Sequence, residues 1–255
     1  MSGISRDSSF DGEELCDGNA EEYVPRSDKK YGSDDETGPY VTVENITRKT
    51  DRWKKQLASY NVRMQNLNPA TSALLVIDMQ NYFLDSGCSA WMEAAPAIVP
   101  NVRALIDIYR SNGLPVLFTA HVHENPAIDG GMMSLWWGNL IMKDTHDAEI
   151  YPEIAPVEGE KVVHKTRYNA FYKTDLDTSL RRLGVEEVVI TGVMTNLCCE
   201  STARDAFFRD YRVFFIMDAT ASVIEEFHIS TLKNLAYGFA HIVNTAEILH
   251  SVASG

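Results

Sequence analysis

From residue 72 onward, short apolar runs alternate with segments in which apolar residues recur at helical spacing. The runs are nearly free of polar positions and rich in β-branched residues, which is typical of strands buried on both faces. Such strands are predicted at 72–78, 115–121, 161–165, 187–193, 212–218 and 241–249. Helices are predicted at 97–112, 175–183, 196–210 and 228–237. Gly113 and Gly184 follow two of these helices, as expected at helix ends.

This alternation predicts an α/β fold of three layers. We expect an open, mainly parallel six-stranded sheet of Rossmann-like type with helices on both faces. Because parallel crossovers are right-handed, the carboxyl ends of the strands share one edge of the sheet, where ligands bind. Residues 125–160 break the alternation with Gly130-Gly131 and Trp136-Trp137-Gly138, and we expect a long excursion there.

The region before the sheet has a different composition. Residues 1–40 are rich in Ser, Gly, Asp and Glu, and carry 11 acidic against 4 basic side chains. Residues 48–65 are predicted as a short amphipathic helix. Its apolar side carries Trp53, Leu57 and Tyr60. We therefore divide the chain into an acidic arm with a short helix at 1–68 and one domain at 69–255. We expect the arm to wrap a neighbouring subunit or to shield the mouth of a pocket.

Composition and charge exclude several classes of function. With 255 residues, of which 45% are apolar, the chain is expected to be globular with one large core. Its net charge of −13 disfavours nucleic acids and anionic membranes as partners, since clustered Lys and Arg bind both. No apolar run approaches the roughly 20 residues of a membrane span, and a signal-peptide core is not recognisable. The four cysteines show no disulfide framework, so we expect free thiols and a cytoplasmic protein.

Three side chains suited to covalent catalysis fall at the predicted carboxyl edge of the sheet. Asp78 ends the first strand, Lys165 ends the third, and Cys198 opens the helix after the fourth. A thiol in the first turn of a helix lies near the positive end of the helix dipole, which together with a nearby Lys favours the thiolate. Each residue also has an ordinary structural role, as a turn cap, a solvated cation or a small buried side chain.

The sequence around these residues resembles the isochorismatase-like cysteine hydrolases. The resemblance covers about residues 70–250 and rests on three motifs in the same order. These are LLVIDMQNYF (74–83), HKTRYNAFYKTDLDTSLRRLG (164–184) and VVITGVMTNLCCESTARDAFFRDYRV (188–213). The resemblance implies an isochorismatase-like hydrolase fold, a homo-oligomer (dimer or tetramer) and a small-molecule substrate, without a cofactor.

Carried over by position, the resemblance implies a catalytic triad. Asp78 matches the D-x-Q aspartate that acts as general base, Lys165 the K-x-R-[YF] lysine that steadies the nucleophile, and Cys198 the T-N-x-C nucleophile. It also implies a cis peptide at Val193–Met194, after which the N–H groups of Met194 and Cys198 form an oxyanion hole. Such a site hydrolyses a small amide or ureido (carbamoyl) C–N bond through a covalent thioester.

Substrate-binding candidates follow from their positions in the motifs. They are Gln80, Phe83, Trp137, Tyr168 and Asn169. The two amides are suited to orienting a carbonyl or carboxylate, and the aromatic rings to excluding water. Phe83 and Trp137 are equally suited to core packing. Arg167 and Arg204 are candidates for contacting a substrate carboxylate or for structural salt bridges.

The stretch after the second strand departs from one branch of the family. Nicotinamidases carry a metal motif resembling T-x-D-x-H-P-x-x-H. The matching stretch here is TAHVHENPAID (119–129), which keeps His123, has His121 in place of the aspartate and lacks the later histidine. We therefore expect no metal, and regard both histidines as turn or pocket residues.

Two other functions stay open. True isochorismatases cleave a vinyl ether and often lack the cysteine, so the presence of Cys198 favours acyl transfer. The alternative is isochorismatase-type vinyl-ether hydrolysis with Asp78 as general acid. A binding domain without turnover is a third reading, which the intact set of three side chains disfavours. The stretch NLCCESTARD (196–205) favours the ureidoacrylate and N-carbamoyl amide hydrolases, but the sequence does not identify the substrate.

Overall fold

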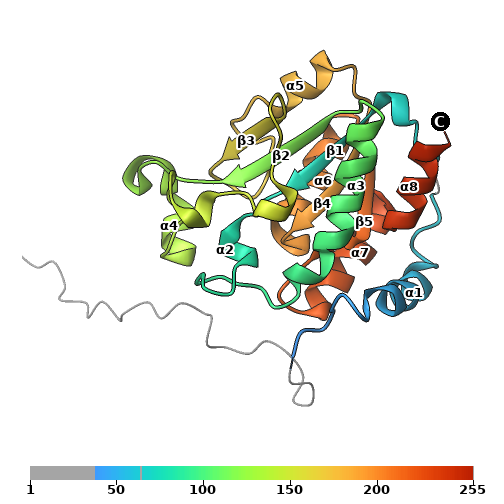
Figure 1. Ribbon diagram of the computed structural model, residues 1–255, viewed down its shortest axis with the longest axis horizontal. Helices are drawn as coiled ribbons and strands as arrows, with labels where there is room; N and C mark the ends of the chain where they lie inside the picture. The colour runs from blue at the N-terminus through green and yellow to red at the C-terminus, as the bar shows by residue number, and fades with distance from the viewer. Residues whose placement is uncertain (1–37, 64, 255) are drawn as a thin grey trace, which may run out of the picture.

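The computed structural model describes residues 38–63 and 65–254, which form an α/β fold around one sheet (Figure 1). The strands are β1 (Ser72–Ile77), β2 (Val116–His121), β3 (Lys161–Lys165), β4 (Glu187–Val193), β5 (Arg212–Ala221) and β6 (His241–Val243). They lie in the order β3-β2-β1-β4-β5-β6, and every neighbouring pair is parallel. The predicted open six-stranded sheet is confirmed, and it is parallel throughout.

The strands make up the middle layer because their side chains are apolar on both faces. Every residue of β1, β2 and β4 is buried, and only the first residue of β5 is exposed. The edge strand β3 is less covered and exposes His164. This pattern explains why the central strands read as continuous apolar runs in the sequence.

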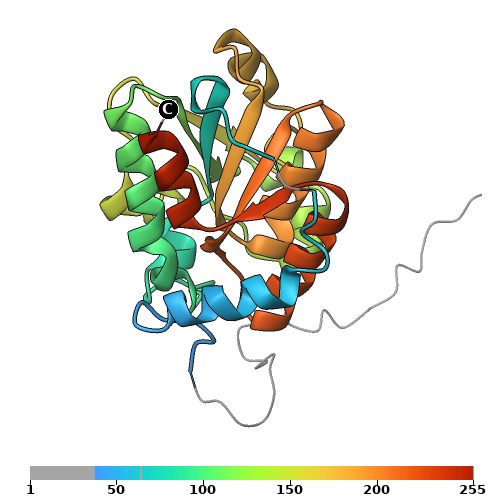
Figure 2. The same ribbon diagram turned by 90° about the vertical axis from the view of Figure 1, so that its right-hand side faces the viewer.

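Helices cover both faces of the sheet. The α-helices are α1 (Ile46–Leu57), α2 (Asn81–Leu84), α3 (Val99–Ser111), α4 (Met132–Trp137), α5 (Leu176–Arg182), α6 (Glu200–Phe208), α7 (Glu225–Gly238) and α8 (Thr245–Ala253). Short helical turns are η2 (Pro69–Thr71), η3 (Ala95–Ile98), η4 (Pro126–Gly130), η5 (His146–Ala148), η6 (Pro152–Ile154) and η7 (Thr195–Cys199). In Figure 2, α3 and α8 lie on one face of the sheet, α6 and α7 on the other, and α1 crosses below.

The prediction for 241–249 as one strand was wrong in its second half. The chain leaves the sheet after Val243 and begins α8 at Thr245. Asn244 caps this helix, because its side chain accepts the N–H of Glu247 at 2.9 Å while the Glu247 carboxylate accepts the N–H of Asn244 at 2.9 Å. This reciprocal capping pattern favours a helix start over continuation of the strand.

The predicted N-terminal helix is shorter than expected but joins the main core. It ends at Leu57, and Trp53 and Leu57 are buried, whereas Tyr60 lies beyond the helix and is 39% exposed. The indole N–H of Trp53 donates to the Glu225 carboxylate of α7 at 2.7 Å. At the end of the predicted arm, the Tyr40 hydroxyl accepts the N–H of Ser222 at 3.1 Å. Residues 1–37, most of that arm, lie outside the described residues.

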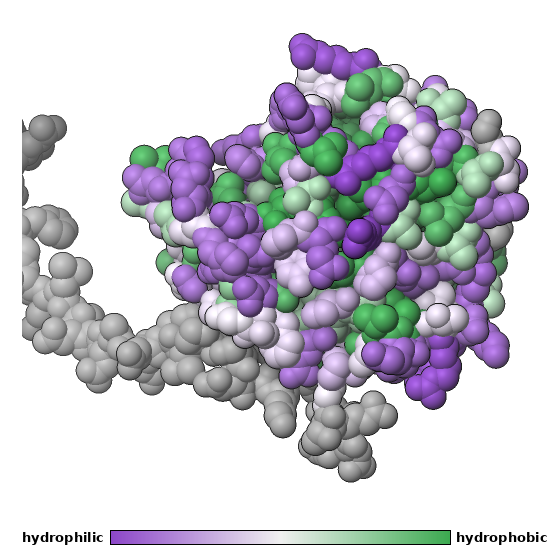
Figure 3. Space-filling view, in the orientation of Figure 1, coloured by the Kyte–Doolittle hydropathy of each residue, from purple (hydrophilic) through white to green (hydrophobic). Residues whose placement is uncertain are grey.

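The excursion at 125–160 is irregular, as predicted, but contains α4 and three short turns. Several large apolar side chains of this segment face solvent, with Ile128 83%, Leu135 78% and Trp136 63% exposed. Figure 3 shows apolar groups among polar ones at the end of the molecule where α4 projects.

Two composition-based expectations concern membranes and disulfides. Within residues 38–63 and 65–254, no helix is long and apolar enough to cross a membrane. Cys88, Cys198 and Cys199 are free thiols. The fourth cysteine, Cys16, lies outside the described range.

Candidate active site

The three predicted catalytic side chains meet at the carboxyl edge of the sheet. Asp78 follows β1, Lys165 is the last residue of β3, and Cys198 lies in the turn η7 after β4. The Lys165 ammonium nitrogen lies 2.7 Å from Oδ2 of Asp78 and 3.4 Å from Sγ of Cys198. Its third polar contact is the carbonyl of Arg167 at 3.0 Å, so all three N–H donors have partners. The three side chains are buried, with at most 5% exposed, which places this charge cluster out of bulk solvent.

The backbone at Asp78 holds its carboxylate in one orientation. Asp78 has φ +48°, a left-handed conformation that a non-glycine residue adopts at a cost of about 1–3 kcal/mol. Its N–H lies 3.2 Å from the carbonyl oxygen and 3.1 Å from Oγ1 of Thr119 on β2. The Thr119 hydroxyl in turn donates to Oδ1 of Asp78 at 2.5 Å. One carboxylate oxygen thus faces Thr119 and the other faces Lys165.

Gly192 permits β4 to approach β1 next to the site. It has φ +109°, and a Cβ atom there would lie 2.0 Å from the carbonyl oxygen of Ile77, the residue before Asp78. Only glycine tolerates both the conformation and the contact. One residue further on, the Val193–Met194 peptide bond is cis, as the resemblance implied.

Electrostatics at Cys198 differ from the sequence-based expectation of a favoured thiolate. Cys198 lies in the π-helical turn η7 rather than in the first turn of α6. Burial raises the pKa of its thiol, and the charge of Asp78 raises it further, against the opposing effect of Lys165. Burial alone would lower the pKa of Lys165, but the charge of Asp78 and the proximity of Cys198 outweigh it, so this pKa is raised. The resting site therefore holds a neutral thiol, which needs a base to become a nucleophile.

Two of the predicted pocket aromatics form a pair beside the triad. The indole N–H of Trp137, at the end of α4, donates to the Tyr168 hydroxyl at 2.6 Å. Burial raises the pKa of Tyr168, and the proximity of Cys198 adds to that effect. The pair therefore connects the excursion to the catalytic edge. Phe83 packs edge-to-face on Tyr82, with ring centroids 5.1 Å apart, and also contacts the main core. These contacts agree with core packing, the second role considered for Phe83 from the sequence.

The two predicted amide ligands are engaged by the protein itself. The Gln80 side chain donates to the carbonyls of His121 and Ala148 at 3.1 and 3.0 Å, and accepts the N–H of His121 at 2.8 Å. Asn169 donates to the Asp205 carboxylate of α6 at 2.6 Å and accepts the N–H of Phe171 at 2.9 Å. Both side chains join separate segments around the site, and their role in substrate binding stays a prediction.

The two arginines have different surroundings. Arg204 pairs with Glu200 one helical turn away at 2.6 Å and stacks on Phe239. It thus forms a structural salt bridge, one of the two roles considered from the sequence. Arg167 donates to the carbonyls of Asp129 and Thr166 at 2.8 and 2.6 Å. Among the described residues it forms no ion pair with a carboxylate, so its charge remains available at the edge of the site.

A buried polar chain leads away from the triad, and sequence analysis missed it. Nε2 of His121 lies 3.1 Å from Nε2 of His123, and Nδ1 of His123 lies 2.9 Å from Oδ1 of Asp129. Both imidazoles are buried. The sequence signal was present in two histidines at alternate positions and an aspartate six residues after the second. The sequence alone did not indicate that η4 brings this aspartate, Asp129, back to His123.

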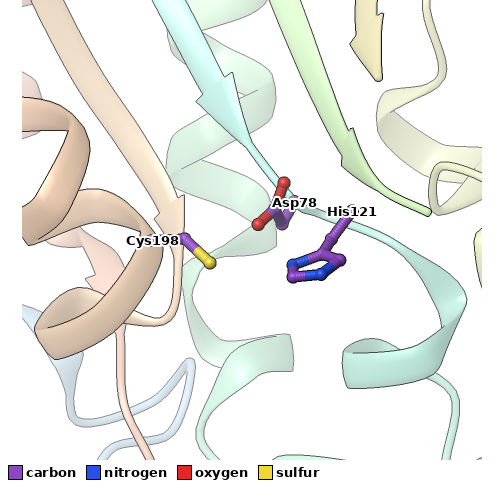
Figure 4. Close-up of side chains that lie close together, drawn as sticks. All are labelled: Asp78, His121 and Cys198. Carbon is purple, nitrogen blue, oxygen red and sulfur yellow. The ribbon is translucent and has the colours of Figure 1, made fainter. Parts of the chain in front are cut away.

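Two groups of side chains have the donors of a cation site. Donor atoms of Asp78, His121 and Cys198 lie within 4.8 Å of one another, and Figure 4 shows the three side chains converging. The Lys165 ammonium already contacts two of them, so a divalent metal does not fit this set as it stands. The second group is Asp85, Cys88 and His146. There His146 pairs with Asp85 at 2.9 Å.

Fold and site together define an α/β protein with a buried Asp–Lys–Cys cluster at the carboxyl edge of a parallel sheet, a class suited to thiol chemistry. Residues 72–247 match the isochorismatase domain family, and the chain belongs to this family, as its motifs indicated.

Individual relatives extend this result. The chain is 46% identical over 196 residues to nicotinamidase 3 of Arabidopsis thaliana, covering 76% of this chain and 94% of the relative. It is 29% identical over 204 residues to a ureidoacrylate amidohydrolase of Caulobacter segnis, covering 71% and 85%. Among solved structures, a cysteine hydrolase from Pseudomonas syringae pv. phaseolicola 1448A superposes with a TM-score of 0.73 at 28% identity, covering 75% of this chain and 96% of that chain.

Proposed function

We propose that the protein is a cysteine amidohydrolase that cleaves a small amide or ureido C–N bond through a thioester on Cys198. The observation that carries this proposal is the buried contact of one ammonium group, that of Lys165, with both Asp78 and Cys198. The names of two relatives, a nicotinamidase and a ureidoacrylate amidohydrolase, support amide chemistry.

In the proposed first half of the reaction, Cys198 attacks the substrate carbonyl. Asp78 accepts the thiol proton as the C–S bond forms, because the thiol is neutral at rest. The N–H groups of Met194 and Cys198 bind the oxyanion of the tetrahedral intermediate. As the C–N bond breaks, Asp78 delivers its proton to the leaving nitrogen, which departs as ammonia or an amine. Water then releases the acid from the thioester.

Lys165 has an electrostatic role in this scheme. Its ammonium stays charged and contacts both the base and the nucleophile. It therefore stabilises the thiolate that forms when the proton moves to Asp78. Its three N–H donors are fully used, so it holds the two side chains in place without contacting substrate.

The candidate substrates are small, planar carbonyl compounds. The paired rings of Trp137 and Tyr168 border the site and suit a flat molecule. Sequence motifs favour ureido and N-carbamoyl compounds, whereas the greater identity to nicotinamidase 3 favours nicotinamide. Arg167 forms no ion pair among the described residues, and its guanidinium suits a substrate carboxylate. We therefore propose nicotinamide and ureido acids as the two classes to be compared.

The test is ammonia release from nicotinamide, biuret, ureido acids and carbamoyl amino acids, with isochorismate as the counter-substrate. The family match leaves vinyl-ether hydrolysis as the second candidate. Amidohydrolase chemistry predicts that both Cys198→Ala and Asp78→Ala abolish turnover. Vinyl-ether chemistry predicts that Cys198→Ala keeps activity and Asp78→Ala loses it. Amide turnover that survives in Cys198→Ala contradicts the proposal.

We further propose a homo-oligomer in the cytoplasm. The exposed apolar side chains of Ile128, Leu135 and Trp136 support association. Apolar groups that face solvent in one chain are typically buried in an interface with another chain. Free thiols at Cys88, Cys198 and Cys199 support a reducing compartment.

A further inference from the structure

A second group of metal-binding side chains lies outside the active site, between the loop after α2 and the turn η5. Asp85 and Cys88 follow α2, and His146 is the first residue of η5. One donor atom from each of the three lies within 4.8 Å of the other two. Nε2 of His146 and Oδ2 of Asp85 are 2.9 Å apart. A carboxylate, a thiol and an imidazole thus converge, although His146 is 61 residues away from Asp85 in the chain.

The surroundings of this group carry an excess of negative charge. The Asp147 carboxylate accepts a hydrogen bond from Sγ of Cys88 at 3.2 Å, and Oε2 of Glu149 lies 3.9 Å from Nδ1 of His146. Together with Asp85, three carboxylates border one thiol and one imidazole. Within residues 38–63 and 65–254, none of these carboxylates pairs with a Lys or an Arg. A divalent cation complements such a group.

The donors of the active site differ in this respect. There the Lys165 ammonium lies 2.7 Å from Asp78 and 3.4 Å from Cys198, in the place that a cation would take. The second group shares no residue with that site. Its Asp85 and His146 side chains are 41% and 61% exposed, so an ion can enter from solvent without opening the core.

We propose that Asp85, Cys88 and His146 form a Zn²⁺ site, with water or Asp147 as the fourth ligand. Zn²⁺ is typically bound by four ligands in a tetrahedron and accepts thiolate, imidazole and carboxylate groups. Mg²⁺ and Ca²⁺ prefer oxygen ligands, so the thiol selects against them. On binding, the Cys88 thiol gives its proton to solvent and its sulfur forms the bond to zinc.

The spacing of the donors suits such a site after small side-chain movements. Bond lengths of about 2.0–2.3 Å place neighbouring ligands of a tetrahedral Zn²⁺ about 3.3–3.6 Å apart. Asp85 and His146 lie slightly closer to each other than this, and a donor of each lies within 4.8 Å of the Cys88 sulfur. Because both side chains are partly exposed, rotation about their side-chain bonds can close the remaining gap.

The bound ion has a structural role, since it links the loop after α2 to the excursion at 125–160. Two hydrogen bonds already join these segments. The Gln80 side chain donates to the carbonyl of Ala148 at 3.0 Å, and the N–H of Asn81 donates to the carbonyl of Glu149 at 2.9 Å. Zn²⁺ adds a third link beside them. No step of the proposed hydrolysis depends on this ion.

The first experiment uses Co²⁺ as a spectroscopic probe of the full chain after treatment with a chelator. A bond between Co²⁺ and a thiolate gives a charge-transfer band in the near ultraviolet, and competition with a chelating dye measures the Zn²⁺ affinity. We expect one Co²⁺ per chain with this band, displaced by Zn²⁺. Cys88→Ser should abolish the band. His146→Gln should weaken Zn²⁺ binding by about 100-fold or more, because loss of even an outer partner of a ligand costs about 10–100-fold.

The second experiment tests the structural role by limited proteolysis. Trypsin cleaves after Lys143, three residues before His146 in the excursion. Zn²⁺ at about 100 times its Kd should slow this cleavage by up to about 100-fold, because the segment opens only after the ion leaves. Cys88→Ser should be cleaved at the same rate with and without Zn²⁺. Equal rates for the wild type with and without the ion would overturn the structural role.

Further variants assign the band to its residue. Cys198→Ala and Cys16→Ser remove other thiols and should keep the band, and His250→Gln, on the exposed face of α8, should keep the Zn²⁺ affinity. Asp85→Asn provides the affinity measurement should His146→Gln fail to fold. The proposal is overturned by a wild type without the band, by a band that persists in Cys88→Ser or disappears in Cys198→Ala, or by wild-type affinity in His146→Gln.

Discussion

The ammonium group of Lys165 contacts both other members of the buried cluster, Asp78 and Cys198. Lys165 is fully buried, yet it remains charged because Asp78 and Cys198 compensate for its loss of hydration. Removing one partner of a buried ion pair leaves the other as an uncompensated charge, which typically costs about 3–5 kcal/mol. Stability and chemistry therefore depend on the same contact.

Lys165→Met tests this dependence. We expect it to abolish turnover and to lower the free energy of unfolding by about 3 kcal/mol, because the Asp78 carboxylate is left buried without its cation. Activity assays and denaturant unfolding provide the two readouts. Lys161→Met is the matched control on the same strand, since its 2.6 Å pair with Asp175 is largely exposed and is worth about 1 kcal/mol or less. Equal effects of the two substitutions would refute the account.

The meeting of Asp78, Lys165 and Cys198 was predictable from sequence, whereas the contacts of the surrounding side chains were not. Asp78, Lys165 and Cys198 each end or follow an apolar strand, so their convergence follows from parallel topology. The engagement of Gln80 and Asn169 by their own backbone and by Asp205 was not visible, because it depends on how segments far apart in sequence pack. The same is true of Asp129, which reaches His123 only through the turn η4.

At the level of elements, the turn η7, which carries Cys198, is supported by helices distant in sequence. His228 of α7 contacts the hydroxyl of Thr195, the first residue of η7, at 2.9 Å. Its ring packs against Trp53 of α1, with centroids 4.6 Å apart. Sequence patterns predicted α1 as an amphipathic helix, but not that it would pack beside His228, which contacts the turn η7. Helix α1 thus supports the turn that carries Cys198, although it precedes the family match, which begins at residue 72.

His228 should make this support sensitive to acid. Burial lowers its pKa from 6.5 to about 4, so the unfolded state binds a proton more readily than the folded state. Its contribution is complete above pH 6.5, and up to about 3 kcal/mol is lost as the pH falls toward 4. Urea unfolding across this range should show a steeper decline for wild type than for His228→Asn. Parallel pH curves for the two proteins would show that His228 is not responsible.

At the scale of the whole molecule, the six-stranded sheet was predictable from the sequence, because buried parallel strands form continuous apolar runs. The order of the strands was not predicted and comes from the structure. Segment 241–249 was misread because an apolar stretch can continue as a strand or begin a helix, and the Asn244 cap decides between them. The excursion at 125–160 was correctly read as irregular, but its exposed apolar side chains could not be foreseen, since exposure depends on tertiary packing.

Those exposed side chains give a prediction about assembly. Leu135→Glu places a charge on α4 at a position 78% exposed in one chain, so the fold should be unaffected. If α4 contacts a second copy, the substitution should shift the protein toward monomer in light scattering after size exclusion. Phe208→Glu, at the end of α6 where the side chain is 71% exposed, is the control and should leave the oligomer unchanged. An oligomer that survives Leu135→Glu would place the interface elsewhere.

The most direct test of covalent catalysis is to trap the intermediate. Enzyme quenched with acid during turnover of nicotinamide or a ureido acid is digested, and its peptides are weighed. The account predicts an acyl or carbamoyl group on Cys198, absent from Cys88 and Cys199 and absent from the Cys198→Ala variant, which should also release no ammonia. Turnover by Cys198→Ala at the wild-type rate, or an adduct on another cysteine alone, would contradict it.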